Sequence, residues 1–108
     1  MAKEKEYFGH PRFHEILEEV RELHNNKNHD YAGKKDPLAN LKGSKRIGIR
    51  PFIGVMIRLQ DKWSRLENFV LSGKLKVKDE GVRDTLKDNI VYSILALILL
   101  DEEEREQI

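Results

Sequence analysis

The chain has 108 residues, which suits one domain and leaves no length for a second domain of ordinary size. Although 36% of the residues are charged, the formal net charge is only +1, which excludes a protein that binds nucleic acid or membranes through its total charge. The lack of cysteine excludes disulfides, a thiolate nucleophile and cysteine-ligated zinc or iron–sulfur sites.

The first predicted helix begins near Pro11, a favourable residue in a first turn. The preceding residues, MAKEKEYFGH, lack the apolar segment of a signal peptide, so we expect a cytoplasmic protein with residues 1–10 as a frayed end. The apolar side chains of the helix recur at spacings of three, four and seven residues, as one buried stripe requires: Phe13, Ile16, Leu17, Val20 and Leu23.

Two connectors and a short helix follow. NNKNHDYAGKKDP is rich in Asn, Asp and Gly and predicts a loop, in which Asp36 and Pro37 cap and open a short helix, DPLANL. KGSKRIGIRP predicts a second, basic connector. A long helix is then predicted from about Pro51 to Ser72-Gly73, with six inward side chains: Ile53, Met56, Ile57, Trp63, Leu66 and Val70.

The last predicted helix runs from near Val82 to Glu104 and is apolar around most of its circumference between residues 90 and 100. That run is shorter than the ~20 residues that span a bilayer, so we expect no membrane partner. We predict a single all-α domain over residues 1–108, with three main helices plus a short helix. A homodimer or higher homo-oligomer would complete the bundle, and residues 102–108 would form a frayed end.

Charge is unevenly distributed along the chain. The segment from Lys34 to Arg65 contains nine basic and two acidic residues, and the segment from Asp79 to Ile108 contains nine acidic and three basic residues. A basic middle and an acidic end suit a site that holds a phosphate and a cation side by side. Alternatively, the opposite charges pair with each other or face water.

Two aspartates lie on the apolar stripe of the last helix. At 100° per residue, Asp84 and Asp88 are 40° apart, in the same sector as Val91, Leu95 and Leu99. Two desolvated carboxylates so close together cost several kcal/mol unless a positive group lies between them. A hard divalent cation such as Mg²⁺ removes that cost. The alternative is that both aspartates pair with Arg or Lys at a partly solvated end of the bundle.

The long helix carries a polar face next to its apolar one, because Arg58, Asp61, Arg65 and Asn68 recur at spacings of three, four and three. Asp61 is a third candidate carboxylate, flanked by guanidinium groups that can bind phosphate oxygens in bidentate fashion. The short link between this helix and the last one, KLKVKDEG, indicates that the two pack antiparallel, and Asp61 would then face the aspartate pair of the last helix. The alternative is a surface ladder in which Asp61 pairs with its flanking arginines.

Three segments together, KNHDYAGKKDPLANL, VMIRLQDKWSRLENF and DTLKDNIVYSILAL, resemble the nucleotide-modification-associated domain 1 family of phages and prophages. That family is similar to the MazG-like all-α nucleoside triphosphate pyrophosphohydrolases. The resemblance covers roughly residues 10 to 100. It implies a MazG-like, usually dimeric protein that binds Mg²⁺, or Mn²⁺, between acidic residues of two helices. Such a protein splits an NTP or dNTP into monophosphate and pyrophosphate, in the bacterial host cell if a phage encodes it.

The resemblance also assigns roles to residues of this chain. It makes Asp61, Asp84 and Asp88 the metal ligands and catalytic residues and puts Asp30 and Tyr31 near the substrate. Our hypothesis for the mechanism adds Glu80 or Glu22 as the base that deprotonates the attacking water. Tyr31 stacks on the nucleotide base or packs on a helix, and Trp63 belongs to the core or forms a base platform. The expected substrate contacts come from Asp30, Tyr31, Lys34, Arg58, Lys62 and Arg65, with further phosphate contacts from Lys35, Lys45 and Arg46.

The chain departs from the MazG pattern in its acid count. Arg58 and Ser64 stand three residues either side of Asp61, and Thr85 stands three residues before Asp88, where that pattern has acids. Glu80, Glu18 or Glu22 could make up the number. A non-catalytic helical oligomer that sequesters a nucleotide is therefore the alternative function. An adaptor for DNA modification is a third, although no helix-turn-helix signature supports a nucleic-acid partner.

Overall fold

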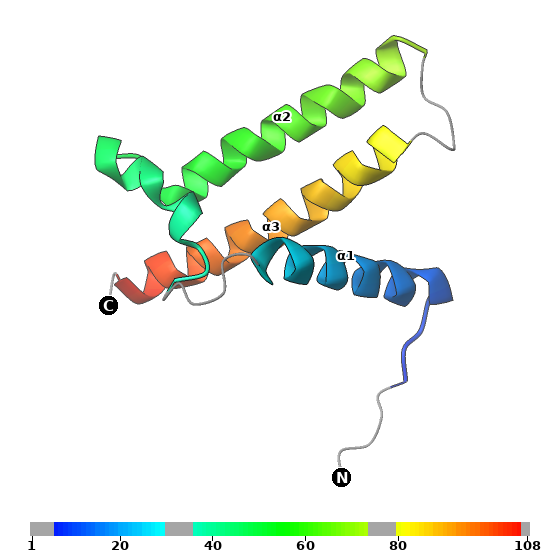
Figure 1. Ribbon diagram of the computed structural model, residues 1–108, viewed down its shortest axis with the longest axis horizontal. Helices are drawn as coiled ribbons and strands as arrows, with labels where there is room; N and C mark the ends of the chain where they lie inside the picture. Colours follow the sequence, from blue (N-terminus) through cyan, green and yellow to red (C-terminus); the bar gives the residue numbers. More distant parts are fainter. Residues whose placement is uncertain (1–5, 30–35, 74–79, 107–108) are drawn as a thin grey trace. The chain divides into compact units, whose positions relative to one another are not determined.

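The computed structural model describes residues 6–29, 36–73 and 80–106, and these residues contain helices but no strand. The helices are α1 (Pro11–His29), η1 (Ala39–Leu41), η2 (Gly43–Ile47), α2 (Pro51–Leu71) and α3 (Glu80–Glu106) (Figure 1). The prediction of an all-α chain is confirmed. Contacts divide the chain into two compact units, Met1–Ala32 and Gly33–Ile108. No helix in the described ranges is long and apolar enough to cross a membrane.

The first unit contains α1, which begins at Pro11 as predicted. The ring nitrogen Nδ1 of His10 accepts a hydrogen bond from the backbone N–H of Arg12 at 3.0 Å and so satisfies a free donor of the first turn. Arg12 also pairs along the helix surface with Glu15 at 3.3 Å and with Glu19 at 3.1 Å. The predicted buried stripe is only partly buried, since Phe13 stays 61% exposed.

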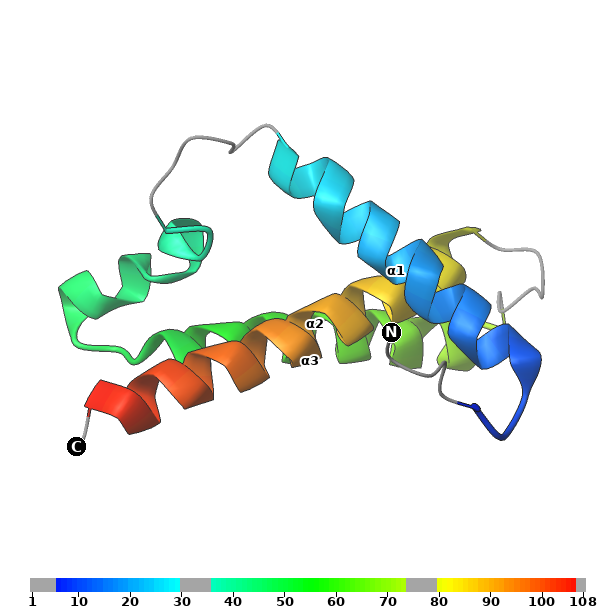
Figure 2. The ribbon, with the colours of Figure 1, turned by 90° about the horizontal axis from the view of Figure 1, so that it is seen from below.

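The second unit is built on an antiparallel pair, α2 and α3, which lie side by side in Figure 1 and in the rotated view of Figure 2. Ion pairs fix the direction, because Arg50, before α2, meets Glu103 and Lys62, farther along α2, meets Asp88. The predicted antiparallel packing is therefore confirmed. The core between these elements consists of Leu38, Leu41, Val55, Leu95, Ala96 and Leu99.

Glycine and proline set the bounds of α2 where the sequence predicted them. Pro51 occupies the first turn, where its missing N–H costs no hydrogen bond. At the other end, Ser72 donates its backbone N–H to the carbonyl of Asn68 at 2.9 Å, and Gly73 adopts a φ of 68°. That left-handed conformation strains a residue with a Cβ atom, so glycine ends the helix.

The segment 36–50, which we call the strap, closes the end of the pair where α2 begins and α3 ends (Figure 1). Asp36 accepts the backbone N–H of Leu38 at 2.9 Å in the turn before η1, but the N-cap residue of η1 is Leu38, so the prediction that Asp36 caps this helix is wrong. The predicted short helix is the single turn η1, and the predicted basic connector contains η2. Leu38 and Leu41 enter the core from the strap.

Ion pairs between the strap and α3 join the basic middle of the sequence to its acidic end. Lys42 Nζ lies 2.6 Å from Asp36 and 2.8 Å from Glu102, and Lys45 pairs with Glu106 at 3.8 Å. Residues 102–106, predicted as part of a frayed end, are therefore helical, because basic partners offset their negative charge. For these residues, the interpretation that opposite charges pair with each other is correct.

Glu103 ties α3 to the start of α2. Its Oε2 accepts hydrogen bonds from Arg50 Nη2 at 2.6 Å and from Nε at 3.1 Å, and its side chain is only 16% exposed. The Arg50 guanidinium lowers the pKa of Glu103 below its ordinary 4.5, and the backbone N–H of Phe52, in the first turn of α2, adds to this effect. Because Arg50 itself makes no side-chain cap, Glu103 supplies negative charge at this helix end.

We expect Glu103→Gln to lower the free energy of unfolding at pH 7 by about 1–2 kcal/mol. Since the folded pKa is depressed, the contribution of Glu103 is present above its ordinary pKa of 4.5 and is lost as the pH falls through the lower folded pKa. Urea unfolding at pH 7 and pH 3 should therefore show that acidification lowers the free energy of unfolding less in Glu103→Gln than in the wild type. Glu104→Gln, at an exposed neighbouring position, serves as the control. If the free energy of unfolding falls equally between pH 7 and pH 3 in both variants and the wild type, Glu103 does not stabilise the fold in this way.

Candidate functional site

The seam between α2 and α3 holds a partly buried ion pair. Lys62 Nζ lies 3.1 Å from Asp88 Oδ2, and the two side chains are only 20% and 22% exposed. The prediction that Asp88 points towards the interior is thus confirmed. A carboxylate removed this far from water requires a nearby positive charge, and α2 supplies one.

Tyr92 lies one turn beyond Asp88 and meets two cations of α2. Arg58 Nη1 donates to the Tyr92 hydroxyl at 3.3 Å, and the guanidinium carbon lies 5.8 Å from the ring centroid. Lys62 Nζ lies 6.0 Å from the same centroid, within range of a cation–π attraction. We call Arg58, Lys62, Asp88 and Tyr92 the seam cluster.

Tyr92 is not among the site residues predicted above, because it lies in the apolar run between residues 90 and 100, which predicts packing. Its position four residues after Asp88 places it on the same helical stripe, and this spacing was the available signal. The seam cluster therefore joins residues one turn apart on α2 to residues one turn apart on α3.

The other predicted carboxylates do not join Asp88. Asp61 and Asp84 are both exposed, so the expectation that the aspartate pair faces the interior is correct for Asp88 alone. At the first turns of α3 it is Thr85 that is buried, at 2% exposure, with its hydroxyl donating to the Gly81 carbonyl at 2.6 Å. On α2, Asp61 is 100° away from Lys62, which points to the seam. Within residues 6–29, 36–73 and 80–106, no three His, Asp or Glu residues form a group that could hold a metal ion.

The remaining predicted site residues fall into two sets. Asp30, Tyr31, Lys34 and Lys35 lie outside the described residues, as does the side chain of Glu80. Arg65 and Arg46 are exposed, and so are Glu18 and Glu22 on α1, where Glu18 pairs with Arg21 at 2.9 Å. Of the predicted substrate-binding residues, the structure therefore places Arg58 and Lys62 together.

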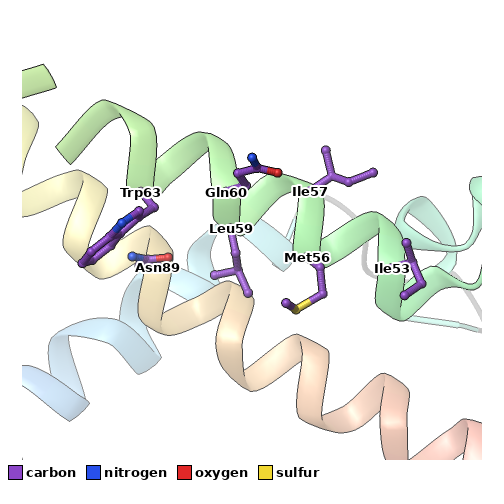
Figure 3. Close-up of a pocket in the computed structure, with 7 residues that line it drawn as sticks. All are labelled: Ile53, Met56, Ile57, Leu59, Gln60, Trp63 and Asn89. Carbon is purple, nitrogen blue, oxygen red and sulfur yellow. The ribbon is translucent and has the colours of Figure 1, made fainter. Parts of the chain in front are cut away.

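A groove of about 490 Å³ runs along another face of α2 (Figure 3). Its lining is almost entirely apolar apart from two carboxamides: Ile53, Met56, Ile57, Leu59, Gln60, Trp63 and Asn89. Figure 3 shows the Trp63 indole beside the Asn89 amide, across the seam. The indole is 58% exposed, so the prediction of Trp63 as a core residue is wrong.

The error over Trp63 has a geometric cause. The sequence of α2 contains two adjacent apolar stripes, one through Ile53, Met56 and Ile57 and the other through Val55 and Leu59. Only the second stripe packs in the core, and the first is 40–52% exposed. The apolar arc of α2 is therefore wider than one neighbouring helix covers.

Chemically, the seam cluster offers one partly buried carboxylate paired with Lys62, and a guanidinium, Arg58, that contacts the neighbouring Tyr92. Exposed Arg65 follows on α2. Such a set can bind phosphate oxygens through Arg and Lys and a cation through Asp. Comparison of the chain with protein-family models, curated proteins and solved structures found no match.

Proposed function

We propose that the protein is a Mg²⁺-dependent pyrophosphohydrolase that splits a nucleoside triphosphate, NTP or dNTP, into monophosphate and pyrophosphate. The observation that carries the proposal is the partly buried Asp88 carboxylate with a cation 3.1 Å away, on a seam lined by Arg58 and Lys62. A magnesium–triphosphate substrate requires this combination, because its metal prefers carboxylate oxygens and its phosphates prefer guanidinium and ammonium groups.

The donor set suits a hard cation in kind. Asp88 alone of the three predicted aspartates lies in the seam, where it already pairs with the positive charge of Lys62. Mg²⁺ can bind through a single carboxylate when waters and substrate phosphates supply its other ligands. When bound, Mg²⁺ would neutralise phosphate charge and polarise a water molecule. Ligands beyond Asp88 would be waters, substrate phosphates or residues of a second copy of the chain.

The reaction would use the chain's own residues as follows. Arg58 and Arg65 bind phosphate oxygens and orient the triphosphate. The water oxygen forms a bond to the α-phosphorus, and the bond between that phosphorus and the bridging oxygen breaks. The bridging oxygen and both electrons of the broken bond leave with the pyrophosphate. A carboxylate, for which Glu80 is the candidate, takes the proton of the water.

The test is incubation of the protein with Mg²⁺ and a panel of normal and modified nucleoside triphosphates, followed by anion-exchange separation of the products. We expect at least one member to give monophosphate and pyrophosphate in equal amounts. If every triphosphate stays intact, the hydrolase proposal is wrong.

A second candidate function is nucleotide sequestration without cleavage. The Lys62–Asp88 pair favours it, since an internal cation that offsets Asp88 reduces the need for a metal. Calorimetry separates the two functions. A sequestering protein binds nucleotide stoichiometrically, returns it intact and depends little on Mg²⁺, whereas the hydrolase consumes it.

The proposal includes a homodimer or higher homo-oligomer, and exposed apolar side chains support it. Besides the α2 groove, α3 exposes Leu86, Ile94, Leu97 and Ile98 to between 39% and 61%. A second copy that covers such surface removes apolar area from water, which drives association.

Trp63 is the one tryptophan of the chain, so its fluorescence reports on the α2 groove. If the second copy covers the groove, we expect the emission to shift to shorter wavelength as the protein concentration rises, in parallel with the mass measured by light scattering. Emission that stays constant while the mass doubles would contradict this location of the interface.

A further inference from the structure

Lys62 and Asp88 form a partly buried ion pair, and separating the two charges costs free energy. Both side chains are about four-fifths buried, and the ammonium lies 3.1 Å from the carboxylate oxygen. A partly desolvated charge that loses its partner is destabilised, so Lys62 leaves Asp88 readily only when each group gains another partner of opposite charge.

A divalent cation at the same carboxylate oxygen would be such a partner for Asp88. It competes directly with Lys62, because two positive groups on one oxygen repel each other strongly where water is partly excluded. The affinity of Asp88 for a metal ion is therefore reduced for as long as the Lys62 ammonium stays in place.

A phosphate would be the corresponding partner for Lys62. The ammonium sits on a flexible four-carbon stem with three donors, and Arg58, one turn earlier on α2, already lies beside the Tyr92 ring that Lys62 approaches. A polyphosphate bound by Arg58 would thus offer Lys62 an anion on the same side of α2 and release Asp88.

We infer that Lys62 is an internal counter-ion of Asp88, and that the pair separates when a divalent cation binds Asp88 and a polyphosphate binds Lys62. The two ligands therefore each bind weakly alone and more tightly together. This inference rests on the proposed function, since it assigns the metal to Asp88. The coupling is reciprocal, because each ligand releases the group that the other needs.

The test measures binding of Mn²⁺, counted as free ion by electron paramagnetic resonance, with and without inorganic pyrophosphate. Protein-free mixtures correct for the Mn²⁺–pyrophosphate complex. We expect pyrophosphate to tighten Mn²⁺ binding to the wild type by at least about 10-fold, a coupling of ~1.4 kcal/mol. Lys62→Met should bind Mn²⁺ alone at least about 10-fold more tightly than the wild type and should lose the coupling.

Two further variants sharpen the result. Lys62→Arg keeps the charge and should bind Mn²⁺ alone no more tightly than the wild type. Lys27→Met, which removes an exposed lysine of α1 that has no predicted role in the site, is the matched control and should match the wild type. The wild-type coupling is measured without any substitution, so the test remains valid if Lys62→Met does not fold.

Two outcomes would overturn the inference and differ in what else they affect. If the wild type and Lys62→Met bind Mn²⁺ equally, or pyrophosphate leaves the wild-type affinity unchanged, Lys62 is not an exchanging counter-ion and the proposed hydrolase is unaffected. If neither protein binds Mn²⁺ under any condition, the metal-dependent function is overturned as well.

Discussion

Leu99→Ala is expected to lower the free energy of unfolding by about 3–4 kcal/mol. Leu99 is 1% exposed and packs in the core with Val55 of α2 and Leu38 and Leu41 of the strap, so its removal leaves a cavity that three elements border. Urea unfolding followed by circular dichroism measures the change.

Leu97→Ala is the matched control, since it makes the same substitution two residues earlier in α3 at a side chain that is 61% exposed. We expect it to change the free energy of unfolding by no more than about 0.5 kcal/mol at protein concentrations where the chain is monomeric. Equal losses at both positions would contradict the placement of the core on the Leu95–Leu99 side of α3.

If the protein is the proposed pyrophosphohydrolase, Asp88→Asn should reduce nucleoside triphosphate turnover by at least roughly 100-fold, because loss of the proposed metal ligand costs more than loss of a residue that only supports one. The substitution keeps the shape of the side chain but removes the negative charge that both Lys62 and a metal ion require. Steady-state rates at saturating Mg²⁺ measure the effect, and the thermal melting of each variant confirms that it is folded.

Asp101→Asn is the control for Asp88→Asn, because Asp101 lies on the same helix but is exposed and away from the seam cluster. Its turnover should equal that of the wild type. Wild-type turnover in Asp88→Asn would remove Asp88 from the site, and with it the observation on which the proposed function depends.

The sequence predicted the helices well where backbone chemistry fixes their ends. Pro11 and Pro51 open α1 and α2, and Gly73 follows the end of α2, because these residues restrict or free φ whatever surrounds them. The short connection between α2 and α3 was sufficient to predict the antiparallel pair.

The faces of the helices were harder to predict, because a wide apolar arc does not specify which part is covered. Trp63 and Met56 were assigned to the core and are exposed, whereas Lys62 was assigned to substrate and is mostly buried against α3. A long side chain such as Lys buries its stem while its charge finds a partner, and periodicity counts it as polar.

The sequence also did not predict which acidic and basic residues pair with each other. The acidic end of α3 was expected to fray, yet Glu102, Glu103 and Glu106 pair with Lys42, Arg50 and Lys45 of the strap. The pattern showed that opposite charges were available, but the partners lie more than fifty residues apart. Only the antiparallel arrangement of α2 and α3 brings them together.

Hydrolysis of a nucleoside triphosphate in ¹⁸O-labelled water, with Mg²⁺ and the wild-type protein, tests the central claim most directly. Mass spectrometry should find one ¹⁸O atom in the nucleoside monophosphate and none in the pyrophosphate, as attack of water on the α-phosphorus requires, and Asp88→Asn should yield neither product at a comparable rate. An unlabelled, unchanged triphosphate, or a diphosphate with labelled inorganic phosphate, would contradict it.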